Sequence, residues 1–212
     1  MVKLYSPDDY YTFINLFNCI VCQCKDNVFT RYQTSTSCTF SPLTYEEFDR
    51  ITTNLACQWQ LSFLKDTPPD TPVALLADHS VDYVISAIAI MKLKRVLLAI
   101  APRNSHAAIR HLVLNAGAKT LITSKKYEEK AQVSMEYKIS CHSFDMFDIP
   151  AMVQEPLHTD VDALIDRQFD PEDKEKTAII IHRYYCYYVH MVQWSYSLVS
   201  LITAQEALPF QS

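Results

Sequence analysis

The centre of the chain alternates between short apolar runs and longer segments in which apolar residues recur with helical spacing. The runs cover residues 73–77, 96–100, 121–123 and 177–182. Continuous apolar runs of this length are typical of strands that are buried on both faces of a sheet. The segments between the first three runs repeat apolar residues every three or four positions, which indicates amphipathic helices. The pattern therefore predicts an α/β fold, a parallel sheet flanked by helices with right-handed crossovers.

The predicted helices begin at residues that can cap them. Thr44 and Glu47 have the spacing of a capping box, and Ser80 and Ser105 precede the next two helices. Gly117 follows the third helix, where a left-handed residue is favoured. The side chains expected to face the core are Phe48, Ile51, Leu55 and Trp59, then Val84, Ile85, Ile88 and Met91, then Ile109, Leu112, Val113 and Ala116.

The two ends of the chain differ from this central part. Residues 1–42 predict a helix over 10–22, a strand over 28–32 and a Ser/Thr-rich connection over 34–41 that Pro42 ends. The stretch 184–205 is uncharged and rich in aromatic residues, but His and Gln interrupt it, so a buried or unpaired helix is favoured over a membrane span. We therefore divide the chain into segments 1–42, 43–182 and 183–212.

Composition excludes several classes of protein. The net charge is -5 and no dense Lys/Arg run is present, which argues against nucleic-acid binding. Gly117 is the only glycine in 212 residues, so neither a P-loop nor a dinucleotide-binding fingerprint can be built. The seven cysteines are odd in number, and the first apolar stretch follows acidic rather than basic residues. These features predict reduced thiols in a cytoplasmic protein.

The candidate metal and catalytic residues favour structural roles. Cys19, Cys22, Cys24 and Cys38 lack the two short hooks of common zinc motifs and lie among apolar residues, so we expect core thiols and no zinc. His182 ends a predicted strand without an identifiable nucleophile or carboxylate partner, and we expect it to be structural. His79 is expected in a surface loop, and no pattern relates His106, His111, His142, His158 and His190. A solvated acidic surface is predicted for Asp145, Asp148, Asp160, Asp162, Asp166, Asp170 and Asp173.

Four strings resemble the adenylate-forming (AMP-binding) enzymes. LTYEEFDRITTNLA, residues 43–56, resembles their opening core motif, and residues 72–105 resemble the strand, helix and second core motif that follow. Lys94 or Arg95 stands where that second motif has a glycine. AAIRHLVLNAGAKTLITS and TAIIIH resemble the next helix and strand and the strand before the phosphate loop. The four strings occur in order over residues 28–182, and Pro-Arg-Asn-Ser at 102–105 resembles the fungal type that joins adenylation to carrier and reductase domains.

The resemblance implies a parent reaction in which a small-molecule carboxylic acid reacts with ATP, in the presence of Mg, to form an acyl-adenylate. Coenzyme A or a carrier phosphopantetheine then accepts the acyl group. The family places a Ser/Thr/Gly loop ending in Gly-x-Pro-Lys after the last strand, whereas here His182 runs into Arg183 and a tyrosine-rich stretch. A skipped segment that resumes in the parent's next helix, a shifted reading frame and true divergence all remain open.

No family residue can therefore be assigned here to a catalytic, cofactor-binding or metal-binding role. The later family motifs would lie beyond Ser212. We expect the N-terminal part of an adenylation domain that is inactive alone and needs no cofactor of its own. The alternatives are an interaction module that associates through an incomplete sheet, and a protein anchored in a membrane by residues 184–205.

Overall fold

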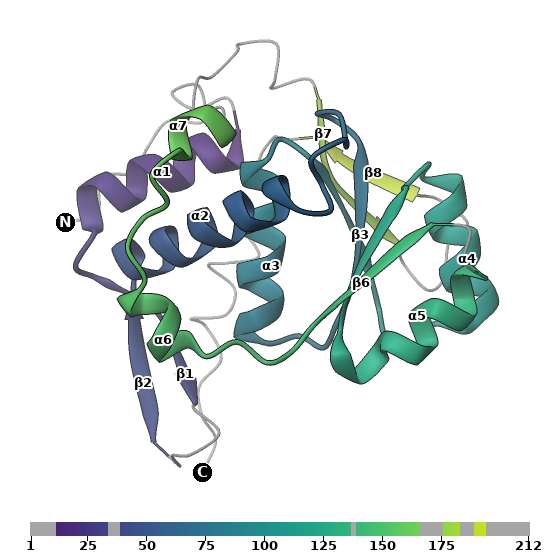
Figure 1. Ribbon diagram of the computed structural model, residues 1–212, viewed down its shortest axis with the longest axis horizontal. Helices are drawn as coiled ribbons and strands as arrows, with labels where there is room; N and C mark the ends of the chain where they lie inside the picture. Colours follow the sequence, from purple (N-terminus) through teal and green to yellow (C-terminus); the bar gives the residue numbers. More distant parts are fainter. Residues whose placement is uncertain (1–11, 34–38, 137–138, 166–175, 183–188, 194–212) are drawn as a thin grey trace.

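A six-stranded sheet lies between two layers of helices (Figure 1). The computed structural model describes residues 12–33, 39–136, 139–165, 176–182 and 189–193. The strands lie side by side in the order β6 (Ser140–Phe144), β5 (Thr120–Ser124), β3 (Pro72–Leu76), β4 (Val96–Ile100), β7 (Thr177–His182) and β8 (Val189–Gln193). The first five are parallel, and β8 is antiparallel to β7.

Each face of the sheet is covered by its own set of helices. On one face lie α1 (Phe13–Cys24), α2 (Tyr45–Leu61) and α3 (Val81–Lys92). On the other lie α4 (His106–Asn115) and α5 (Glu128–Met135), which follows the 3-10 turn η2 (Lys125–Tyr127). The short helices α6 (Ile149–Gln154) and α7 (Val161–Leu164) lie beside α2, and β1 (Val28–Gln33) and β2 (Phe40–Thr44) form a separate antiparallel pair.

The central strand β3 explains why the apolar runs are continuous. Its Val73 pairs with Leu97 of β4 on one side and with Thr120 of β5 on the other, both in parallel. Val73 and Leu75 pack into the core on the α2–α3 face, whereas Ala74 and Leu76 pack on the α4–α5 face. Because both faces are buried, no position in the strand favours a polar residue. The predicted fold class is confirmed.

The predicted helix starts are confirmed by hydrogen bonds. The Thr44 hydroxyl accepts from the Glu47 N–H at 3.2 Å, and the Glu47 carboxylate accepts from the Thr44 N–H at 2.8 Å. Ser80 and Ser105 cap α3 and α4 in the same way. Gly117, just after α4, has a φ of 71° and therefore ends the helix as predicted.

The predicted inward faces are also buried, except that Ala116 is only partly buried and Val84 is exposed. Val84 is 39% exposed, whereas its neighbour Ile85 is fully buried. The buried stripe of α3 contains Ile85, Ile88 and Ala89, and Val84 lies on the flank of that stripe. The prediction that Val84 faces the core is wrong.

Two further predictions are corrected by strand pairing. Residues 40–41, expected to be connection, belong to β2, where Pro42 pairs with Arg31 of β1. Proline is tolerated there because the two-stranded sheet consists only of edge strands. Residues 189–193, inside the predicted C-terminal helix, form β8, so that helix is wrong over these five residues. A short apolar run fits either type of element, and pairing with β7 decides it here.

The rest of the C-terminal prediction, residues 183–188 and 194–212, lies outside the described residues. One of the open readings, a skipped segment after which the chain resumes in the parent's next helix, gains no support from residues 189–193, which form the antiparallel strand β8. No described helix is long and apolar enough to cross a membrane.

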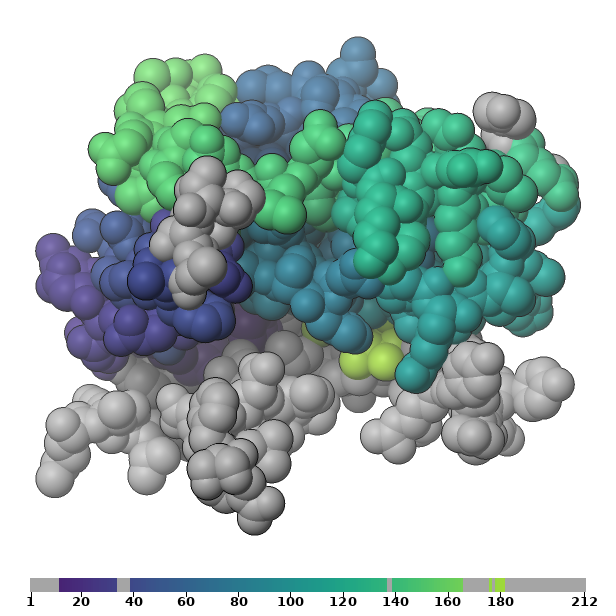
Figure 2. Space-filling model, turned by 90° about the horizontal axis from the view of Figure 1, so that it is seen from below, coloured from purple at the N-terminus to yellow at the C-terminus, as the bar shows by residue number. Residues whose placement is uncertain are grey.

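A long segment after β6 returns to α2 and is fastened to it by polar side chains. Figure 2 shows the green surface of this segment beside the purple and blue surfaces of α1 and α2. Arg50 donates to the carbonyl of Val153 at 2.6 Å. The amide of Asn54 donates to the carbonyl of Pro156 at 2.9 Å and accepts from the N–H of His158 at 3.0 Å. The segment thereby encloses the α2 side of the core.

Stability should depend on the protonation of His142. Its ring stacks on Phe63 with a centroid separation of 4.0 Å and an interplanar angle of 13°. Burial lowers the pKa of His142 below its usual value of 6.5. The unfolded chain therefore binds the proton more readily, so this contribution is present above pH 6.5 and is lost as the pH falls through that value towards the folded pKa.

We predict that His142→Phe, which keeps an aromatic ring but cannot titrate, loses less unfolding free energy than the wild type between about pH 7.5 and about pH 5.5. Urea unfolding at each pH measures this difference. Parallel pH profiles for the two proteins would show that His142 is not the titrating group.

Candidate functional site

The carboxyl edge of the sheet is the first place to look for a ligand site. In α/β sheets, ligands bind beyond the carboxyl ends of strands whose connections lead to opposite faces. Here β3 leads into α3 on one face, and β4 leads into α4 on the other. The crevice position therefore lies between the ends of β3 and β4, next to residues 77–79 and 101–104. His182 ends β7 at the same edge, because β4 and β7 are parallel.

A polar cluster joins the ends of β3 and β5 at this edge. The Asp78 carboxylate accepts from Lys126 Nζ at 2.6 Å and from the Tyr127 hydroxyl at 2.5 Å. These two hydrogen bonds lower the pKa of Asp78, and the bond to Asp78 raises the pKa of Lys126. Asp78 is therefore a poor general base, and Lys126 remains a cation. Each of these residues follows a predicted strand. Because parallel strands end at the same edge of a sheet, their proximity could have been predicted from the sequence.

The loops around the crevice are fastened by similar contacts. Lys130 donates to the carbonyl of Pro102 at 2.6 Å, which fixes the loop after β4 to α5. The exposed His79 lies in the loop before α3, as predicted. Its ring is edge-on to the ring of Tyr83, with 5.5 Å between the ring centroids. The role of His182 stays a prediction, because its side chain lies outside the described part of the structure.

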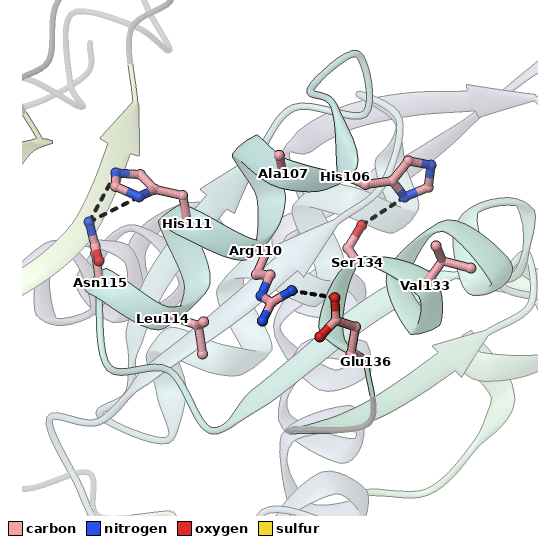
Figure 3. A pocket seen from close by; sticks show the side chains of 9 residues that line it. All are labelled: His106, Ala107, Arg110, His111, Leu114, Asn115, Val133, Ser134 and Glu136. Atoms are coloured by element: carbon pink, nitrogen blue, oxygen red, sulfur yellow. Dashed lines mark hydrogen bonds and ion pairs between the residues drawn. The ribbon is translucent and has the colours of Figure 1, made fainter.

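A pocket of about 440 Å³ opens between α4 and α5 (Figure 3). Two contacts link the helices there: an ion pair between Arg110 and Glu136, and a hydrogen bond of 3.1 Å between His106 Nδ1 and Ser134 Oγ. Figure 3 also shows His111 bonded to Asn115 along α4, away from the other histidine. Leu114 and Val133 add exposed apolar surface, at 44% and 56% exposure.

The Ser–His contact in this pocket is not an activated nucleophile. The Ser134 hydroxyl donates to the carbonyl of Lys130 at 2.7 Å, one helical turn earlier. Its proton is thus already engaged, and His106 must act as the donor to Ser134. A general base would have to accept that proton instead. The pair is therefore a contact between helices, and the pocket is an open groove without a catalytic set.

The cysteine prediction is partly wrong. Cys22 is exposed, and Cys19 and Cys24 are half-buried, because α1 buries only Phe17 fully and turns its other sides outward. Cys38 lies outside the described residues. No group of three potential metal ligands occurs in the described ranges. The absence of zinc remains a prediction.

The acidic-surface prediction is confirmed where it can be checked. The exposed residues are Asp145, Asp148, Asp160 and Asp162. The other three, Asp166, Asp170 and Asp173, lie outside the described part.

Comparison with known proteins decides the family. The family model described as AMP-binding enzyme matches residues 26–182, well over half of the chain. The chain belongs to the AMP-binding enzyme family. Over 90 residues it is 30% identical to the nonribosomal peptide synthetase GRA1 of Gibberella zeae; the match covers 42% of this chain and 1% of that protein.

Solved structures of adenylate-forming ligases have the same fold. The N-terminal subdomain of Klebsiella oxytoca NpsA, in complex with 3-hydroxyanthranilyl-AMSN, matches with a TM-score of 0.56 and 17% identity over 80% of this chain and 36% of that one. The fatty acyl-adenylate ligase of L. pneumophila, in complex with acyl adenylate and pyrophosphate, matches with a TM-score of 0.59 and 11% identity. This match covers 82% of this chain and 28% of that one. This chain therefore spans about a third of the structures it matches.

The two candidates for the family's glycine position after α3 differ in backbone conformation. Lys94 has a φ of 53°, in the left-handed region that glycine favours. Of the two candidates, Lys94 and Arg95, it is Lys94 that adopts the glycine-like conformation.

At the carboxyl edge we expect a poor fit for a nucleoside triphosphate and its magnesium ion. The Asp78 carboxylate at the end of β3 is already bonded to Lys126 and Tyr127. The residues that follow β7, Arg183-Tyr-Tyr-Cys-Tyr-Tyr188, contain no glycine to bring backbone amides close to phosphate. No step of a reaction is assigned to these residues.

Proposed function

We propose that this polypeptide is the N-terminal part of an adenylate-forming domain and is not catalytic by itself. The parent reaction would be the ATP-dependent activation of a carboxylic acid to an acyl-adenylate, followed by transfer to a thiol. Membership of the AMP-binding family supports the reaction class. The observation that supports inactivity is the sequence after β7, where the six residues before β8 hold no glycine.

The physical argument concerns the triphosphate. Attack of a carboxylate on the α-phosphate requires the β- and γ-phosphates to be held in line by donors that are placed in advance. Successive backbone amides make such a cradle, and glycine lets them approach phosphate closely. A connection built of one Arg, one Cys and four Tyr supplies bulk and one cation instead.

A second candidate is an interaction module, and one observation favours it. The outer strand β6 is short and carries no charged residue, whereas charged residues commonly protect exposed sheet edges from pairing. Towards the other end of the sheet, the edge of β7 that faces away from β4 is already paired with β8 in the described structure. Association through β6 would give a concentration-dependent dimer.

Equilibrium dialysis with labelled ATP and Mg²⁺ tests the proposal on the purified chain. We expect no saturable ATP binding. Saturable binding that competes with ADP or AMP would contradict the proposal. Sedimentation at several concentrations separates the second candidate, which predicts a dimer that Cys141→Pro in β6 disrupts.

A further inference from the structure

We propose that a basic pocket at the amino edge of the sheet, opposite the carboxyl edge, binds a phosphate group. The pocket has a volume of about 390 Å³ and lies between the end of α2, the loop that follows it and the end of α3. Among the described residues, its lining contains the cations Lys65, Lys94 and Arg95 and one carboxylate, Asp66. A lining with two more positive than negative groups suits a phosphate, which carries a charge of about -1.5 to -2 at neutral pH.

Arg95 is a buried charge whose hydrogen-bond partners among the described residues are both neutral. It is 5% exposed, and burial lowers the pKa of its guanidinium. Nη1 donates to the carbonyl of Leu93 at 2.8 Å, and Nη2 donates to the side-chain oxygen of Gln60 at 3.3 Å. Buried charges are normally paired with an opposite charge. The nearby Asp70 affects Arg95 through its electrostatic charge, with no hydrogen bond between them in the described structure. The Asp70 carboxylate forms an ion pair with Lys176 Nζ at 3.4 Å.

One edge of the guanidinium is left for a ligand. Arg95 Nε is buried without a hydrogen-bond partner among the described residues, and Nη2 beside it has only the long bond to Gln60. Nε and Nη2 together form the side-on fork that binds two oxygens of one oxyanion. A phosphate that displaces the Gln60 side chain would satisfy both donors.

Helix capping explains only part of this arrangement. Cations near the ends of α2 and α3 are favoured by the helix dipoles, and Arg95 does cap a carbonyl of α3 through Nη1. Capping uses that one nitrogen, and it leaves Nε without a partner among the described residues and Nη2 with only the bond to Gln60. It also does not require a buried guanidinium, since exposed cations are also favoured at helix C-termini.

The test is equilibrium dialysis of the full chain against labelled inorganic phosphate at constant ionic strength in chloride. We expect one saturable phosphate per chain. Arg95→Lys keeps the charge but loses the fork, and should weaken binding roughly tenfold or more. Lys94→Gly removes a cation at a position whose positive φ suits glycine, so it should weaken binding. Lys119→Gln, an equal charge change on the exposed surface, should bind like the wild type.

Each outcome decides the proposal. Absence of saturable binding by the wild type would overturn it, as would equal affinity in Arg95→Lys or Lys94→Gly. Equal weakening in Lys119→Gln would reduce the effect to net charge and would also overturn it. If Arg95→Lys does not fold, the phosphate affinities of Lys94→Gly and Lys119→Gln still test the proposal. Because the pocket lies at the opposite edge of the sheet, the result is independent of whether the chain binds ATP.

Discussion

Asp49→Ala is expected to lower the free energy of unfolding by about 3 kcal/mol, because it removes a carboxylate that pairs with a buried ammonium. Lys92 of α3 is 4% exposed in its side chain and reaches across to α2. Its Nζ donates to Asp49 Oδ1 at 2.5 Å, to the Thr53 hydroxyl at 2.7 Å and to the Asp49 carbonyl at 3.0 Å. The hydroxyl and the carbonyl remain in the variant, but neither carries a full charge. Urea unfolding followed by circular dichroism measures the loss.

Lys92→Met is the matched control, since it removes the charge and keeps most of the apolar stem. Asp49 is 28% exposed, so water can solvate its carboxylate once the ammonium is gone. The loss should be clearly smaller than that of Asp49→Ala, because removing the buried charge removes its need for a partner. A Lys92→Met protein that is less stable than Asp49→Ala would contradict this account of the α2–α3 contact.

The parts of the fold that follow from local chemistry could be predicted from the sequence. The capping box at Thr44 and the serine caps of α3 and α4 each depend on residues within one helical turn. Strands β3 and β4 are apolar throughout because both of their faces are covered, and that property is visible in the sequence alone. Membership of the AMP-binding family was likewise visible in four short strings.

The parts that depend on distant contacts could not be predicted. The strand β8 has no local signal that separates it from a helix, and only its pairing with β7 defines it. The segment after β6 has no clear periodic pattern in its sequence, and its position depends on Asn54, about 100 residues earlier in the chain. At the two edges of the sheet, the partners of Asp78 and the environment of Arg95 likewise come from separate elements.

The chain's proposed lack of catalysis has the largest expected effect. Loss of one preorganised donor to a developing charge typically costs roughly a hundredfold or more in rate. The connection after β7 lacks the glycines that a cradle of several amides requires, and Arg183 is its only cation. A single guanidinium cannot replace several donors that are fixed in advance. Carboxylate-dependent exchange between pyrophosphate and ATP should therefore fall below detection.

That exchange, measured on purified and monodisperse protein with labelled pyrophosphate, is the most direct test of the central claim. The acids should include aromatic, aliphatic and amino acids, and an active adenylate-forming enzyme should be assayed in parallel to show that the conditions support exchange. The account predicts no exchange above the protein-free background with any acid. Exchange that rises in proportion to this protein and disappears when the acid is omitted would contradict it.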